Sequence, residues 1–169
     1  SGVLRRSLDS MSTLLSQSIA EVRISAAIPS SDTFSIATLV AEAQQSAALY
    51  ASASGCVLTV PIVDPLLGSA GNRLLIAAAL MNLLQNAFKF THPHTEITLS
   101  AREVDDRVRI EVQDHCGGLP AGAAAKLFKP FAQANPDRSG LGLGLSIARR
   151  SVEADGGTLS VRDLPGVGC

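Results

Sequence analysis

The feature that most constrains the fold is a change of hydrophobic period along the chain. Two stretches alternate apolar and polar residues, as strands with one buried face do, and Asp105-Asp106 lies between them. This pattern predicts an antiparallel hairpin. Helical patterns run from Asn72, a plausible N-cap, to about Phe90 and from Leu143 to Ala154. The apolar strand positions are Ile97, Leu99, Ala101, Val108, Ile110 and Val112.

Shorter signals complete the order of elements. They are Phe34 with Ile36 for a short strand, Leu39 to Tyr50 for a helix, Cys56 to Val63 for a β-rich run, and Leu159 with Val161 for a last strand. Strands interspersed with helices around one hairpin predict an α/β fold of the α+β kind. We expect a two-layer sandwich in which helices cover one face of a mixed sheet.

An amphipathic helix is predicted at the N-terminus, over residues 3 to 24. Its a/d seam consists of Leu4, Leu8, Met11, Leu15, Ser18 and Val22. Such a helix either lies on its own domain or forms half of a helical hairpin that packs in a bundle. Residues 25 to 33, which include Pro29, read as a linker and favour the bundle.

Composition excludes several classes of protein. The 169 residues are 46% hydrophobic, which is enough for the core of one main domain. The net charge of -1 argues against a nucleic-acid surface. The longest apolar run, Leu74 to Met81, is too short to span a membrane. The three cysteines include no CxxC pair, so we expect neither a disulfide framework nor a structural zinc site.

One polar cluster lies on the helix that begins after Asn72. At helical spacing, Asn82, Asn86, Lys89 and Phe90 share a face, and leucines occupy the other side. Amide oxygens suit Mg2+, and a lysine supplies positive charge for phosphate. The alternative is an ordinary solvated helix face.

Three further clusters follow in the chain. Asp114-His115-Cys116-Gly117-Gly118 comes directly after a strand, and adjacent glycines let a backbone approach a flat ligand. Phe128 and Phe131 flank Lys129-Pro130 and could equally form a small satellite core. Alternating glycines from Gly140 to Gly144 open a helix, whose N-terminus favours an anion.

In this order, the four clusters resemble the boxes of the ATP-binding catalytic domain of sensor histidine kinases, within the superfamily of gyrase, Hsp90 and MutL. Residues 82–89 resemble the N box, 114–118 the G1 box, 128–131 the F box and 140–144 the G2 box. The resemblance implies residues 29–169 as the catalytic domain. It implies residues 1–28 as a linker and the second helix of a dimerisation and phosphoacceptor hairpin.

The resemblance also implies roles for individual residues. Asn86 would ligate Mg2+, Asn82 and Lys89 would hold phosphate oxygens, and these three would carry catalysis. Asp114 would accept a hydrogen bond from the adenine amino group. The other implied nucleotide-binding residues are Phe90, Cys116 and Gly118 around the adenine, Phe128 and Phe131 of the F box, Arg138 of a short lid, and Gly140, Leu141, Gly142, Leu143 and Gly144 along the triphosphate.

Three features distinguish the chain within this superfamily. Cys116 occupies the first glycine position of the usual DxGxG. Asn82 stands where ATPase relatives carry a glutamate that activates water, and a carboxamide cannot act as a base. Gly166-Val167-Gly168 resembles the start of a further glycine motif, and Cys169 falls where the last core strand would begin, so we expect that strand to be truncated.

The implied function is phosphoryl transfer from ATP to a histidine, and then to an aspartate on a response-regulator receiver domain. The implied partners are ATP, Mg2+, that receiver domain and a second copy through the hairpin, in the cytoplasm, with any membrane anchor outside this chain. The helix bearing the phosphoacceptor histidine is expected to be absent from these residues. The alternatives are an ATPase or remodelling module of the same superfamily and a degenerate domain that only binds a partner.

Overall fold

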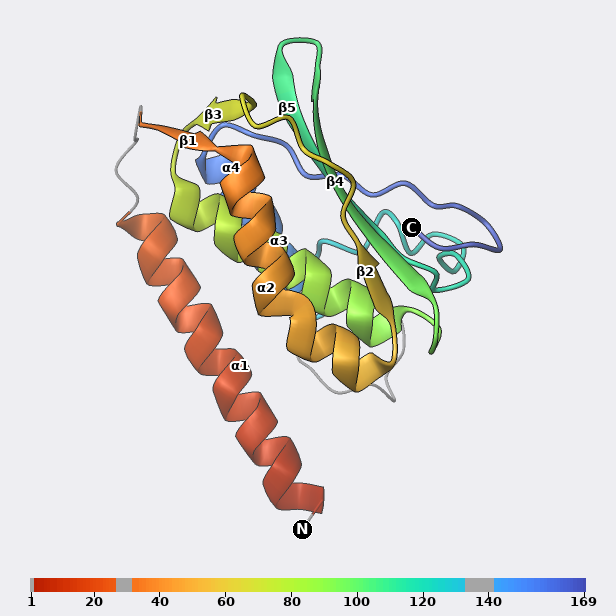
Figure 1. Cartoon of the computed structure of the whole chain (residues 1–169). Coiled ribbons are helices and arrows are strands. Elements are labelled where there is room, and N and C mark those ends of the chain that lie inside the picture. The colour runs from red at the N-terminus through yellow and green to blue at the C-terminus, as the bar shows by residue number, and fades with distance from the viewer. Residues whose placement is uncertain (1, 27–31, 133–141) are drawn as a thin grey trace.

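A computed structural model describes residues 2–26, 32–132 and 142–169 (Figure 1). The elements in chain order are α1 (Gly2–Ser25), β1 (Thr33–Ser35), α2 (Ile36–Ser54), β2 (Val57–Thr59), β3 (Gly68–Ala70), α3 (Arg73–Phe90), β4 (Glu96–Val104), β5 (Arg107–Gln113) and α4 (Gly144–Ala154). Helices α2, α3 and α4 lie on one side of the long hairpin, and α1 extends away from the rest (Figure 1).

The main sheet is mixed, as predicted. Its strand order is β2-β4-β5, with β2 parallel to β4 and β4 antiparallel to β5. A separate two-stranded ribbon pairs β1 with β3. The predicted two-layer α+β sandwich, with helices over one face of a mixed sheet, is therefore confirmed.

The central hairpin follows from its alternating pattern. Ile97 and Leu99 of β4 point into the core and are fully buried. At the turn, Asp105 and Asp106 have φ angles of 51° and 57°. Positive φ at two successive turn residues matches the right-handed twist of the flanking strands, and aspartate tolerates this conformation better than most residues.

Side-chain caps decide where two helices begin. Asn72 Oδ1 accepts hydrogen bonds from the N–H groups of Leu74 at 3.1 Å and Leu75 at 3.3 Å, so the predicted cap of α3 is confirmed. Ser35 Oγ accepts from the Thr38 N–H at 3.2 Å and caps α2. The strand predicted to include Ile36 therefore ends one residue earlier, and Ile36 is the buried first residue of α2.

One strand prediction was too long and another was wrong. The β-rich run from Cys56 to Val63 forms a strand only over Val57–Thr59. The last strand predicted at Leu159 and Val161 does not form, because no backbone hydrogen bond joins these residues to a neighbouring strand within the described part of the chain. The chain instead turns back on itself, with a bridge between Leu164 and Gly168.

Helix α3 supplies the centre of the core. Its buried apolar side packs with α2 and the inner face of the sheet in one cluster. Leu84 is fully buried at the middle of this helix, whereas Leu74 in its first turn is 67% exposed. The members of the cluster are Ile36, Leu39, Val40, Ala43, Ala47, Cys56, Leu67, Leu80, Leu84, Ala87, Phe88, Ile97 and Leu99.

Helix α1 buries little of its apolar seam. Leu4, Leu8, Met11, Leu15 and Val22 are all more than half exposed. An ion pair of 3.3 Å between Arg150 of α4 and Glu21 joins α1 to the domain. None of the helices in the described ranges is sufficiently long and apolar to cross a lipid bilayer.

Replacing Leu84 by alanine is expected to lower the free energy of unfolding by about 2 to 5 kcal/mol, because it removes a buried side chain and leaves a cavity. The matched control is Leu74→Ala on the same helix, which should change stability by no more than about 0.5 kcal/mol. Urea denaturation followed by circular dichroism measures both. Equal losses would contradict this account of the core.

Candidate functional site

The polar side of α3 faces the start of α4. Asn82 and Asn86 are half-buried and lie one helical turn apart. Asn82 Oδ1 lies 3.7 Å from the position that a Cβ on Gly144 would occupy. The N box and the last glycine of the G2 box, which are far apart in the sequence, therefore border the same space. A helix N-terminus and two carboxamides offer donors for phosphate and oxygen ligands for a hard cation.

Positive charge lies at the C-terminal end of the same helix. Lys89 Nζ sits over the ring of Phe90, 5.2 Å from its centroid. Both side chains are half-buried. Their stacking places an ammonium group and an aromatic ring side by side at the end of α3.

Two hydrogen bonds join the end of α3 to the segment after β5. The hydroxyl Oγ1 of Thr91, a residue only 5% exposed, accepts from the N–H of His115 at 3.1 Å. The N–H of His92 donates to the carbonyl of His115 at 3.0 Å. These bonds fix the N box relative to Asp114, which precedes His115.

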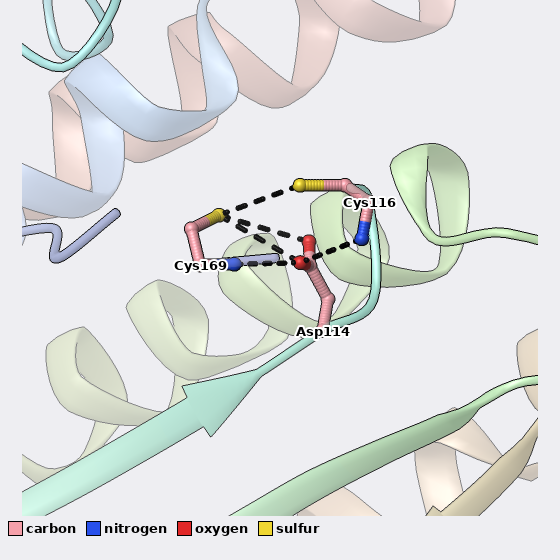
Figure 2. A group of neighbouring side chains, drawn as sticks. All are labelled: Asp114, Cys116 and Cys169. Atoms are coloured by element: carbon pink, nitrogen blue, oxygen red, sulfur yellow. Dashed lines mark hydrogen bonds between the residues drawn. The ribbon is translucent and has the colours of Figure 1, made fainter. Parts of the chain in front are cut away.

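Asp114 is the centre of a compact polar cluster (Figure 2). The residue is 4% exposed, and its Oδ1 accepts from the N–H of Cys116 at 3.2 Å and of Cys169 at 3.0 Å. The Asp114 N–H donates in return to the Cys169 carbonyl at 2.9 Å. A buried carboxylate held in this way is suited to accept a hydrogen bond from a ligand at a defined position.

The glycines of the G1 box serve close backbone contacts. Gly117 and Gly118 have φ angles of 90° and 98°, which side chains rarely allow. The Gly117 N–H donates to the Val167 carbonyl at 3.0 Å, and its own carbonyl accepts from Gly166 at 3.1 Å. A Cβ on Gly168 would lie 2.1 Å from the Asp114 carbonyl oxygen, so only glycine fits there.

The F box lies against α4 and the glycine-rich segment. Arg149 Cζ is 5.3 Å from the centroid of the Phe128 ring. Phe131 is 69% exposed. Gly142 has a φ of 67°, and a Cβ there would lie 2.4 Å from the Ala132 carbonyl oxygen. The end of the F box and the second half of the G2 box therefore touch.

The structure thus brings together most of the residues singled out in the sequence. Leu143 is buried, Cys116 borders Asp114 and its sulfur contacts the Gly118 carbonyl, and Gly142 and Gly144 line the approach to α4. Arg138, Gly140 and Leu141 lie outside the described residues.

Sequence reasoning missed two residues of the site. Thr91 lies just beyond the N box of residues 82–89 and was given no role, and Cys169 was seen only as the residue that follows Gly166-Val167-Gly168. The glycines of this segment could have indicated the contact, because Gly168 permits the close approach to Asp114 that brings Cys169 beside it.

The two cysteines beside Asp114 are held as thiols. Burial raises the pKa of the Cys116 thiol, and the nearby Asp114 carboxylate raises it further. Burial also raises the pKa of Cys169, and here the Asp114 charge is the next largest cause. A negative charge on either sulfur is disfavoured because the site already carries one.

Comparison with known proteins identifies the family. Residues 71–169 match the model of the histidine kinase-, DNA gyrase B- and HSP90-like ATPases. The chain belongs to this family. Its domain is the ATP-binding catalytic domain of a sensor histidine kinase.

Individual relatives of this histidine kinase domain agree. The alginate biosynthesis sensor protein KinB of Pseudomonas aeruginosa is 34% identical over 130 residues, which are 77% of this chain and 22% of that protein. The sensor protein KdpD of Mycobacterium tuberculosis is 41% identical over 96 residues, 56% of this chain and 11% of its own length. The chain therefore spans less than a quarter of these curated relatives.

Solved structures agree on the fold. Full-length ShkA in complex with AMPPNP superposes with a TM-score of 0.81 at 29% identity, covering 99% of this chain and 36% of that one. The catalytic domain of the histidine kinase ThkA gives 0.65 at 25% identity, covering 73% of this chain and 80% of that one.

Replacing Thr91 by valine should lower the free energy of unfolding by about 1 to 3 kcal/mol, because the His115 N–H loses its acceptor. Thr91→Ser keeps the hydroxyl and should retain most of the stability. Thermal unfolding of the two variants shows whether a loss of stability comes from removing the hydroxyl or from removing the methyl group. A serine variant as unstable as the valine variant would show that packing matters more than the hydrogen bond.

Proposed function

We propose that this chain binds Mg-ATP between α3, the G1 turn and the start of α4. It then supplies the γ-phosphoryl group to a histidine on a helix outside these residues, from which the group passes to a response-regulator aspartate. The observation that carries the proposal is the meeting of three separate segments at one site. The Thr91–His115 bond ties the N box to Asp114, and Asn82 borders Gly144.

The described residues fit the parts of this ligand. Asp114 is a buried acceptor for the amino group of an adenine, at an edge where glycines keep the backbone close. Asn82, Lys89 and the amides at the start of α4 supply donors for phosphate oxygens. Cys116 and Gly118, on either side of Gly117, would border the base, and Phe90 would pack against it. Phe128, Phe131 and Leu143, with Gly142 and Gly144 of the glycine-rich segment, would enclose the remainder.

Mg2+ fits the donor set of α3. The ion, when bound, would neutralise charge on the phosphates, and the Asn86 carboxamide oxygen is a hard ligand of the kind that it prefers. The contribution of the chain is positioning and charge complementarity, which is how phosphoryl transfer is generally catalysed.

Asn82 favours transfer to a protein over rapid hydrolysis of ATP. A carboxamide has no lone pair basic enough to take a proton from water, so this helix face lacks a general base at the position where ATPase relatives carry a glutamate. Fast steady-state turnover of ATP would therefore favour the ATPase or remodelling alternative. Absence of nucleotide binding would favour a domain that only binds a partner.

The exposed seam of α1 supports a division of the chain. We propose that residues 1–28 form a linker and one helix of a hairpin that pairs with a second copy, and that residues 29–169 form the catalytic unit. Five seam residues are more than half exposed, and a bundle would bury them. A domain with this function would work in the cytoplasm, where ATP and response regulators are found.

Calorimetric titration is expected to show that the 169-residue chain binds ATP in the presence of Mg2+. Incubation with γ-labelled ATP should leave no acid-labile phosphohistidine on it, because we expect the phosphoacceptor helix to lie outside these residues. A stable phosphohistidine on His92, His94 or His115 would contradict the proposed division of labour.

Asn86→Ala should reduce nucleotide affinity in Mg2+ to the value that the unaltered chain shows in EDTA, with a change in stability within about 0.5 kcal/mol. The matched control is Gln85→Ala. Gln85 is the neighbouring carboxamide, but its Nε2 donates to the Tyr50 hydroxyl on α2 at 2.9 Å, so it points away from the site. If both variants bind Mg-ATP equally well, Asn86 is not the metal ligand.

A further inference from the structure

The cluster around Asp114 contains sulfur ligands that the proposed reaction does not use. One carboxylate oxygen of Asp114 and the sulfurs of Cys116 and Cys169 all lie within 4.8 Å of one another. The two sulfurs are 4.0 Å apart, and Cys169 Sγ is 3.8 Å from each Asp114 carboxylate oxygen. Figure 2 shows the three side chains converging on the space between them.

These separations are close to those of a tetrahedral metal centre. With Zn–S bonds of about 2.3 Å and a Zn–O bond of about 2.1 Å, tetrahedral angles place two sulfurs about 3.8 Å apart and a sulfur and an oxygen about 3.6 Å apart. The distances from the Cys169 sulfur are only slightly longer. The Cys116 sulfur lies within 4.8 Å of the Asp114 oxygen and would move closer to it when an ion binds. A disulfide would instead require the sulfurs to close to about 2.0 Å. The geometry therefore favours a bound cation over a covalent bond.

The backbone holds both sulfur-bearing residues in place. Cys116 and Cys169 each donate an N–H to Asp114 Oδ1, and the Cys169 carbonyl accepts from the Asp114 N–H. Gly168 allows this approach, because any side chain there would collide with the Asp114 carbonyl. These hydrogen bonds are made by backbone groups and not by the sulfurs, so they would hold the ligands in place and lower the entropy lost on binding.

The chemistry of the ligands selects the kind of metal. Thiolate sulfur suits Zn2+, whereas Mg2+ prefers an octahedral shell of oxygen atoms. Three protein ligands leave the fourth tetrahedral position for water, so this would be an open site. It differs in this respect from the closed four-ligand structural sites that the cysteine spacing argues against.

We propose that Asp114, Cys116 and Cys169 form a Zn2+ site, and that the bound ion and the base of the nucleotide exclude each other at Asp114. As the two Zn–S bonds form, the two thiols release their protons to solvent, and Asp114 contributes one carboxylate oxygen. The metal site itself is independent of the proposed kinase function. The mutual exclusion rests on that function, because the same carboxylate would accept from adenine.

The metal site is tested with Co2+ as a spectroscopic substitute for Zn2+ on the reduced 169-residue chain. We expect a sulfur-to-cobalt charge-transfer band in the near ultraviolet and tetrahedral ligand-field bands in the visible, both abolished by added Zn2+. Cys116→Ser and Cys169→Ser should each lose the charge-transfer intensity of one thiolate and bind Co2+ more weakly. The matched control is Cys56→Ser, because Cys56 Sγ instead contacts the carbonyls of Ser54 and His92.

Three results would overturn the metal site. The first is a folded, reduced chain that shows no cobalt bands. The second is a set of bands that persists unchanged in both the Cys116 and Cys169 variants. The third is a chain that, under the same reducing conditions, loses the mass of two hydrogens because a Cys116–Cys169 disulfide has formed. Circular dichroism of each variant separates loss of ligation from loss of folding.

Exclusion is tested by titrating a fluorescent Mg-nucleotide with and without Zn2+. At a free Zn2+ concentration about ten times its own Kd, exclusive binding raises the apparent nucleotide Kd about tenfold. Cys169→Ser, which sees the same chelation of Zn2+ by nucleotide, should show a much smaller rise relative to its own Kd. An equal rise in both proteins would overturn exclusion. Cobalt bands in a chain that binds no nucleotide would instead refute the proposed function and leave the metal site standing.

Discussion

The candidate site depends on helix α3 having one apolar and one polar side. Leu80 and Leu84 are buried against the sheet and α2, and this packing leaves no freedom for the helix to rotate about its axis. A rotation of one residue, about 100°, would press a carboxamide into the core, where it would lack hydrogen-bond partners. The hydrophobic core therefore decides where Asn82 and Asn86 point, although neither belongs to it.

The same principle extends to the segments that meet α3. The Thr91 hydroxyl binds the chain after β5, and the Asp114 backbone binds Cys169 at the far end of the sequence. Each contact provides an acceptor for a backbone N–H, that of His115 in the first case and that of Asp114 in the second. The hydrogen bonds that satisfy these backbone groups also bring the polar cluster together, so the site forms as the chain folds.

Local signals predicted much of this structure from the sequence. The Asn72 cap, the Asp105-Asp106 turn and the alternation of Ile97 and Leu99 depend on near neighbours, and all were confirmed. Ile36 was placed in a strand because its apolar character cannot reveal that Ser35 caps a helix. The strand expected at Leu159 finds no partner among the residues that the structure describes, and β3 was missed because Gly68–Ala70 is short and has small side chains.

The residues of the candidate site likewise divide into those that local sequence predicts and those that only the tertiary fold brings together. The N box was readable because Asn82, Asn86 and Lys89 share one helix face, a property of spacing alone. The approach of Cys169 to Cys116 was not readable, because 53 residues separate them and only the tertiary fold closes that gap. Gly168 allows the backbone to approach Asp114 closely. The sequence does not reveal this role, because it does not show which residue lies next to the glycine in space.

The ion pair between Arg150 of α4 and Glu21 of α1 is a weak contact between the N-terminal helix and the domain. Both partners are about half exposed, at 55% for Arg150 and 49% for Glu21, so the pair contributes at most about 1 kcal/mol. An interaction of that strength changes the equilibrium between α1 bound to α4 and α1 detached from it by only about fivefold. Because α4 also begins beside Asn82, the helix that contacts α1 is the same helix that borders the candidate nucleotide site.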